Sequence, residues 1–387
     1  MFFQEITIMT SKTGDKNRKA IQKPIFIILS LLLIFFLVGC EHLNRSEAKG
    51  PEKAHIKISE NWYSQDSSKI SIGIANIKNH VSSTGTASID KNKQKILNVI
   101  DELKKYKVNM ILFPEFSLTG YFWDDTPECW NYMREGLTNN QLEWLAEVKS
   151  KLDDDLNFII FNNIRLNPDK PDGKFLNSTF VIHKDFDVAK LTSKKNEQAY
   201  IYDKTFLPGI EKIFTASGKD DSLVLDTKWG RFGFTTCYDM SFAQIYQEYA
   251  TFDQVDAIIQ LASWRGTSTR EYSAMNVKSD HYYGFIWDLM ASSQSAFNQV
   301  WIFASNAVGK QKRGDYEFWG GSGVWAPSGM NLVQGPHVSE ELIVMHHIDI
   351  KGQTKFEHDD FHYYKDFIEI YNPIIDKRAH TRTRGKQ

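Results

Sequence analysis

A strand–helix–strand pattern over residues 70–113 constrains the fold more than any other feature of the chain. Isoleucines alternate with small or polar residues over 70–77, which predicts a strand. Apolar residues at helical spacing predict a helix over 89–106, and the apolar run 108–113 predicts a second strand. Because a unit of this length favours pairing of both strands in one sheet, we expect an α/β fold.

A glutamate comes directly after the second of these strands. Glu115 would therefore lie at the carboxyl edge of the sheet, where α/β folds place their sites. Phe113, Phe116 and Tyr121 would surround it with aromatic rings, and a carboxylate in such surroundings suits a general base. An ordinary surface glutamate is the alternative that this stretch leaves open.

A cysteine stands at a second predicted strand end. The run 231–236 is typical of a buried strand, and from residue 239 apolar side chains recur three or four positions apart, as in a helix. Cys237 would project from this turn, with the first N–H groups of the helix facing whatever the thiol attacks. The helix end would also lower the pKa of the thiol. A buried structural cysteine is the alternative.

A lysine lies between these two residues in the chain order. Lys204 stands among aromatic residues in the run 202–208, just before a proline turn, and Glu211 follows seven positions later. Taken alone, Lys204 could be a solvated surface charge.

The order Glu115, Lys204, Cys237, with these flanking residues, resembles the nitrilase or carbon–nitrogen hydrolase superfamily. The similarity covers roughly residues 69–350. Its motifs are Phe113-Pro114-Glu115 with Thr119-Gly120-Tyr121, then 202–208, then 230–239, followed by the blocks 260–264, 304–306 and 320–323. Two positions depart from the family pattern: Phe206, where histidine is common, and Ala262-Ser263, where Pro-Ser or Thr-Ala is common.

The resemblance implies a four-layer α-β-β-α sandwich of two six-stranded sheets and a Glu-Lys-Cys catalytic triad. It implies that Cys237 forms a thioester with the acyl group of a small-molecule amide, that Glu115 moves protons, and that Lys204 and the Tyr238 N–H stabilise the oxyanion. Glu211 resembles a second glutamate that holds the lysine, and Tyr121 and Trp264 are expected to line the substrate pocket. The resemblance implies no metal or organic cofactor, and it favours a homodimer.

The start of the chain resembles a bacterial lipoprotein signal. Basic residues over 12–23 precede an apolar run over 24–39 that ends in Leu37-Val38-Gly39-Cys40. We therefore predict a signal peptide over 1–39, lipid attachment at Cys40, a tether over 40–68, the hydrolase domain over 69–350 and a C-terminal extension over 351–387. This places the protein in the cell envelope, on the outer membrane or the outer face of the cytoplasmic membrane. A plain N-terminal anchor is the alternative.

Charge and cysteine content exclude other classes. The 387-residue chain has a formal net charge of −2, which gives no support for nucleic-acid binding. Its three cysteines do not form the pattern of a disulfide framework. Within the superfamily, the sequence around Cys237 is closer to amidases than to true nitrilases, with similarity to the pantetheinase and biotinidase branch. A catalytically silent envelope lipoprotein and acyl transfer to an amine or thiol are the alternative functions.

Overall fold

The computed structural model describes residues 56–81, 86–121, 126–135, 141–191, 200–218, 222–311, 317–371 and 373–374. The predicted signal peptide, Cys40 and the first part of the predicted tether lie outside the described residues. Within the described ranges, no helix combines the length and the apolar character needed to cross a membrane.

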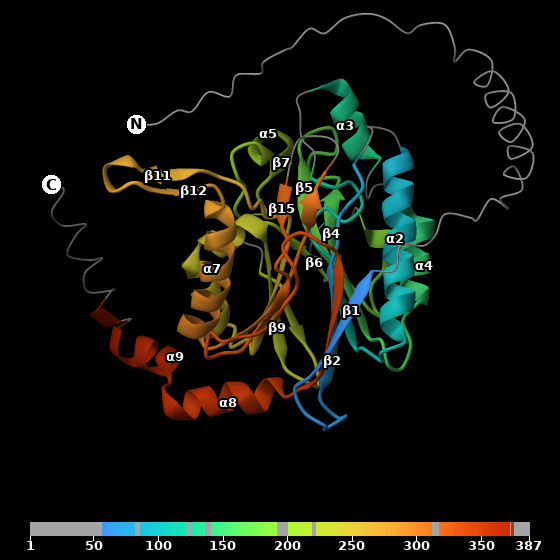
Figure 1. Cartoon of the computed structure of the whole chain (residues 1–387). Coiled ribbons are helices and arrows are strands. Elements are labelled where there is room, and N and C mark those ends of the chain that lie inside the picture. Colours follow the sequence, from blue (N-terminus) through green and yellow to red (C-terminus); the bar gives the residue numbers. More distant parts are fainter. Residues whose placement is uncertain are drawn as a thin grey trace, which may run out of the picture. The chain divides into compact units, whose positions relative to one another are not determined.

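Two sheets form the centre of the fold (Figure 1). The first has eight strands in the order β1-β18-β2-β3-β4-β5-β6, with β7 paired to β5. In chain order these are β1 (Lys57–Trp62), β2 (Ile70–Asn76), β3 (Met110–Leu112), β4 (Phe158–Arg165), β5 (Phe175–Ile182), β6 (Ile201–Asp203), β7 (Thr215–Ala216) and β18 (Glu341–Ile348). The neighbours β2, β3 and β4 run parallel, as the strand–helix–strand pattern predicts.

The second sheet has six strands in the order β17-β16-β13-β10-β9-β8. They are β8 (Val224–Asp226), β9 (Arg231–Thr236), β10 (Ala257–Ala262), β13 (Trp301–Asn306), β16 (Gly323–Trp325) and β17 (Asn331–Gln334). The central strands β9, β10 and β13 are parallel, so their carboxyl ends meet at one edge.

Helices cover the outer faces of both sheets. Figure 1 shows α2 (Thr86–Lys104) and α4 (Leu142–Ser150) against the first sheet and α7 (Tyr282–Asn298) against the second, where α6 (Ala243–Thr251) also packs. Strand side chains alternate between two cores: Ile259 lies between the sheets, whereas its neighbour Ile258 packs under the outer helices. This arrangement confirms the predicted α-β-β-α sandwich.

The predicted tether is wrong at its C-terminal end, because β1 belongs to the first sheet. Its backbone pairs in parallel with β18 from Lys57↔Glu341 to Trp62↔His346. The strand was missed because it is an edge strand with largely polar side chains, so it lacks the apolar run that marks a central strand. With β1 and β7, the first sheet has eight strands and not the six expected.

The chain after β18 folds into helices. These are α8 (Ile350–Asp360), α9 (Tyr363–Asp366) and the π-helical turn η6 (Phe367–Tyr371). Helix α8 packs on the rest of the fold, since its residue Ile350 is buried and the Gln299 side chain donates to the Glu357 and Phe361 carbonyl oxygens. The basic residues over 377–386 lie outside the described part.

The remaining elements are short and, apart from the turn at Cys237, were not expected from the sequence. They are α3 (Pro127–Arg134), η2 (Val188–Lys190), α5 (Glu211–Phe214), η4 (Cys237–Ser241), the hairpin of β11 (Arg270–Tyr272) and β12 (Val277–Ser279) with η5 (Ser273–Met275) between them, and the pair β14 (Val308–Lys310) and β15 (Glu317–Trp319).

Candidate active site

Three predicted residues meet in a buried ionic cluster. The Lys204 Nζ lies 2.9 Å from Glu115 Oε1 and 2.8 Å from Glu211 Oε2. All three side chains are fully buried. Glu115 comes after β3, Lys204 directly follows β6, and Glu211 begins α5. The carboxyl edge of the first sheet therefore brings Lys204 into contact with Glu115, which lies 89 positions earlier in the chain.

The second sheet fixes the other side of Glu115. The backbone N–H of Ser263, just past β10, donates to Glu115 Oε2 at 2.9 Å. The Ser263 hydroxyl donates to the Glu115 carbonyl oxygen at 2.8 Å, and the Glu115 N–H donates to the Ala262 carbonyl oxygen at 3.2 Å. Glu115 thus lies at the junction of the two sheets, with both carboxylate oxygens engaged.

Cys237 lies at the end of β9 in an uncommon backbone conformation. Its φ is +49°, in the left-handed region that a residue with a side chain adopts at a cost of about 1–2 kcal/mol. The Gln260 side chain donates to the Cys237 carbonyl oxygen at 3.1 Å and holds the turn. The side chain is buried and interacts with Glu115, Lys204 and Glu211.

The thiol pKa differs from the expectation. Burial raises the pKa of Cys237 well above its usual value, and the negative charge of Glu115 raises it further, while Lys204 acts in the opposite direction. The lowering of the pKa expected from a helix end is outweighed by burial, and η4 (Cys237–Ser241) is only a five-residue turn. The resting thiol is therefore protonated.

The charged groups have distinct proton affinities. Burial alone would lower the pKa of Lys204, but the charges of Glu115 and Glu211 outweigh it and raise the pKa well above its usual value. Burial raises the pKa of Glu211 to about 7, although the charge of Lys204 opposes the shift. The lysine therefore holds its proton, and the pKa of Glu211 lies near neutral pH.

Two of the predicted pocket residues lie beside the cluster. Tyr121 is buried, with its ring edge-on to Phe116 at 5.4 Å. Its pKa is raised, first by burial and then by the charge of Glu211, which shows that its ring is close to the cluster. Trp264 follows Ser263, shares a packed cluster with Cys237 and is oriented by a bond from its Nε1 to the Tyr283 carbonyl oxygen at 2.8 Å.

Tyr238 is placed next to the thiol by the chain itself. Its backbone N–H belongs to the first turn of η4, directly after Cys237. Its half-buried ring packs edge-on against Phe242 at 5.3 Å. Phe206, which stands where the family often has histidine, stacks on the same Phe242 ring at 3.6 Å.

Two residues of the site were missed. Asn177 Nδ2 donates to Glu115 Oε1 and to Glu211 Oε1, and Asn177 lies inside β5. Asp239 accepts the backbone N–H groups of Thr236 and Phe206, and so ties the two sheets together. For Asn177 the signal was a polar side chain within the apolar run of β5, but such a signal does not reveal which partner the side chain meets.

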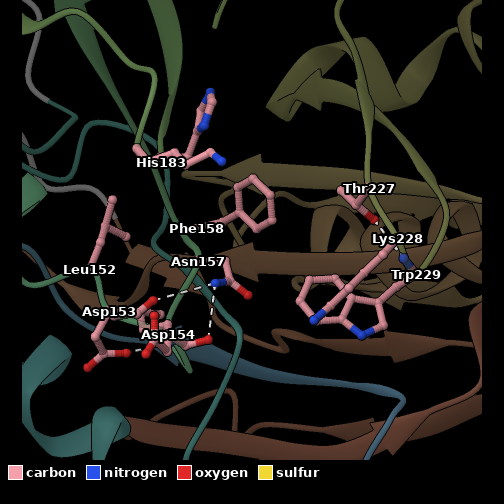
Figure 2. Close-up of a pocket in the computed structure, with 11 residues that line it drawn as sticks. Leu152, Asp153, Asp154, Asn157, Phe158, His183, Thr227, Lys228 and Trp229 are labelled. Carbon is pink, nitrogen blue, oxygen red and sulfur yellow. Dashed lines mark hydrogen bonds between the residues drawn. The ribbon is translucent and has the colours of Figure 1, made fainter.

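A separate groove opens at the opposite ends of the strands (Figure 2). The groove has a volume of about 590 Å³ and is lined by the start of β4 and by the turn before β9. No residue of the ionic cluster lines it. Its lining comprises Leu152, Asp153, Asp154, Leu156, Asn157, Phe158, His183, Lys184, Thr227, Lys228 and Trp229. No group of three or more His, Cys, Asp or Glu side chains among the described residues could hold a metal ion.

The fold and the cluster define a class: an α-β-β-α sandwich with a thiol, a lysine and two carboxylates buried where its sheets meet. The sequence profile of the carbon-nitrogen hydrolase family matches residues 72–354. This match spans most of the chain, and the protein therefore belongs to that family.

Relatives agree with this assignment. The omega-amidase NIT2 of Bos taurus is 25% identical over 265 residues, which cover 67% of this chain and 84% of the relative. The carbon-nitrogen hydrolase of Helicobacter pylori G27 shares the fold with a TM-score of 0.61 at 18% identity, over 79% of this chain and 97% of the other. An amidase from Nesterenkonia sp. AN1, solved with the acetamide moiety of fluoroacetamide added covalently at its active site cysteine, gives 0.54 at 13% identity, over 76% and 97%.

Proposed function

We propose that the protein hydrolyses a linear, non-peptide amide through a thioester on Cys237, with Glu115 and Lys204 completing a catalytic triad. The observation that carries this proposal is the buried contact of Lys204 with Glu115 beside the Cys237 thiol. A buried carboxylate next to a thiol is suited to remove the thiol proton. Relatives named as amidases support an amide substrate.

The first half of the reaction forms the thioester. Because the resting thiol is protonated, Glu115 takes its proton as the sulfur attacks the amide carbonyl carbon. The carbonyl π electrons move to oxygen, and the Lys204 ammonium and the Tyr238 N–H stabilise the oxyanion, at about 3 kcal/mol per donor. The C–N bond then breaks, and Glu115 gives the proton to the leaving nitrogen.

The second half releases the acid. Glu115, again ionised, takes a proton from water as the water oxygen attacks the thioester carbonyl. The C–S bond breaks, the carboxylic acid leaves, and the proton on Glu115 returns to the sulfur. Two of the three Lys204 N–H bonds are directed at Glu115 and Glu211 in the described part of the chain, which leaves the third for the oxyanion.

The thioester is the decisive test. The wild-type protein is incubated with short aliphatic amides, terminal amides of dicarboxylic acids and pantetheine-type amides, and intact-mass spectrometry follows the acyl adduct. The Cys237→Ala protein should keep its fold and lose both adduct and turnover, and Cys237→Ser should be nearly as inactive because a hydroxyl is a poorer nucleophile. Full activity in Cys237→Ala would refute the assignment.

The position in the cell is a separate part of the proposal. Lipid attachment at Cys40, after removal of residues 1–39, would hold the hydrolase in the bacterial cell envelope by residues 41–55. The support is the apolar run before Cys40 and its basic flank. Metabolic labelling with a radioactive fatty acid should mark the wild-type protein and leave Cys40→Ala unlabelled and released from membranes.

A homodimer is the proposed assembly. Its support is the outward face of α7, where Phe285, Leu289 and Phe297 are 59%, 47% and 74% exposed. Light scattering should give twice the mass of one chain, and Phe285→Glu with Leu289→Glu should give a monomer that keeps the fold.

A further inference from the structure

One side-chain amide lies between the two carboxylates of the site. Asn177 Nδ2 donates to Glu115 Oε1 at 2.8 Å and to Glu211 Oε1 at 2.7 Å. The residue is 1% exposed, so no bulk water competes for these bonds. We propose that Asn177 is a positioning residue that holds the Glu115 and Glu211 carboxylates in place beside Lys204 and sets the pH range over which the cluster activates the Cys237 thiol. This inference rests on the proposed function of the same site.

The orientation of the amide is fixed by a backbone group. The Phe116 N–H donates to Asn162 Oδ1 at 3.0 Å, and a backbone N–H cannot accept. The Asn162 Nδ2 is therefore the end that meets Asn177, and it donates to Asn177 Oδ1 at 2.8 Å. This leaves the Asn177 NH₂ group facing the carboxylates. The reverse orientation would place an amide oxygen against two anions.

The bond from Asn177 favours the charged form of Glu211. A carboxylate that accepts N–H bonds is stabilised as an anion, whereas burial stabilises the protonated acid. At Glu211 the two effects compete: burial raises its pKa to about 7, and the bonds from Asn177 and Lys204 act in the opposite direction. The titratable groups that face this pair are Lys204 after β6, Cys237 at the start of η4 and Tyr121 in the loop after β3.

The test follows alkylation of the Cys237 thiol by iodoacetamide from pH 5 to pH 9, read by mass spectrometry. This readout needs no knowledge of the substrate. In the wild type the rate should rise with pH as the carboxyl proton of the cluster is lost. This rising part of the pH–rate profile is the acid limb. In Asn177→Ala the acid limb should move to higher pH by about one unit, so that the alkylation rate at pH 6 falls about tenfold.

Asn163→Ala is the matched control. Asn163 is an equally buried asparagine on β4, and its Oδ1 accepts the Thr119 N–H at 3.2 Å and touches no carboxylate. This variant should lose stability and keep the acid limb of the wild type. If both alanine variants shift the limb equally, or if neither does, Asn177 has only a structural role and the inference is overturned.

A second variant covers the case in which Asn177→Ala does not fold. Asn177→Asp keeps the side-chain shape and replaces the shared donor with a third carboxyl group, so the limb should move further in the same direction. The two proposals fail separately. If wild-type Cys237 is alkylated no faster than Cys129, the proposed function fails. If Cys237 is preferred but neither Asn177 variant moves the limb, only the positioning role fails.

Discussion

Replacing Lys204 with methionine removes one buried charge and keeps the length of the side chain. At an effective dielectric constant of about 20, two unit charges at the 2.9 Å separation of Lys204 and Glu115 attract by about 6 kcal/mol. Most of this offsets the cost of burying the ions, and removal of one partner from a buried pair costs about 3–5 kcal/mol. We expect a loss of this size in the free energy of unfolding of Lys204→Met at pH 8.

The loss should depend on pH. Without the lysine, Glu115 and Glu211 face each other as buried anions, so both would hold their protons to higher pH than in the unfolded chain. A group with a raised folded-state pKa contributes stability at low pH that is lost as the pH rises. Urea unfolding of both proteins at pH 5 and pH 8 should therefore give a smaller difference at pH 5, by about half or more.

A double variant supplies the control for this experiment. Lys204→Met combined with Glu211→Gln contains one buried acid in place of two, and it should recover part of the stability lost at pH 8. A loss that is equal at pH 5 and pH 8, or no loss at pH 8, would show that the three side chains do not form an ionic cluster.

Three further changes test other parts of the structure. The pKa of Glu211 is raised from 4.5 to about 7, so protonation of Glu211 contributes about 3 kcal/mol to the free energy of unfolding below pH 4.5. This contribution is lost as the pH rises through 7. In Glu211→Gln the free energy of unfolding in urea should therefore change less between pH 5 and pH 8 than in the wild type. Asp239→Asn replaces one of the two oxygens that accept the Phe206 and Thr236 N–H groups with an NH₂ donor, so one buried N–H loses its acceptor. The change should cost about 2 kcal/mol at pH 8, measured in the same way, and an unchanged value would show that Asp239 does not join the sheets. Gly233→Ala would place a Cβ 2.8 Å from the Tyr249 ring and should lower stability by about 1–3 kcal/mol in thermal unfolding, whereas Gly209→Ala, with open space around it, should change little.

The sequence predicts the central strands and the triad for the same reason. Strands such as β3 and β9 are buried on both faces, so their apolar runs stand out, and a reactive residue at the end of such a run is conspicuous. Glu115 and Cys237 are found in this way. The edge strand β1 has no such run, because its side chains are half-exposed and its stability comes from backbone pairing with β18.

The contacts within the site are not predictable from local sequence. The role of Asn177 depends on the register of β5, which turns this residue and not its neighbour toward the carboxylates. The pKa direction of Cys237 likewise depends on burial between two sheets and on a carboxylate that is more than a hundred positions away. A sequence motif shows the adjacent turn, which favours a lowered pKa, and misses the larger effect of burial.

The proposed cycle explains why two carboxylates surround one lysine. Glu115 becomes neutral each time it takes the thiol proton, and at that moment Lys204 loses one of its two anionic partners. A buried ammonium without a partner would be destabilised by several kcal/mol. Glu211 lies 2.8 Å from the same Nζ and takes no part in the transfer, so above the Glu211 pKa of about 7 Lys204 keeps a counter-ion at every step. The cation can therefore remain charged and aimed at the oxyanion while Glu115 changes its protonation state.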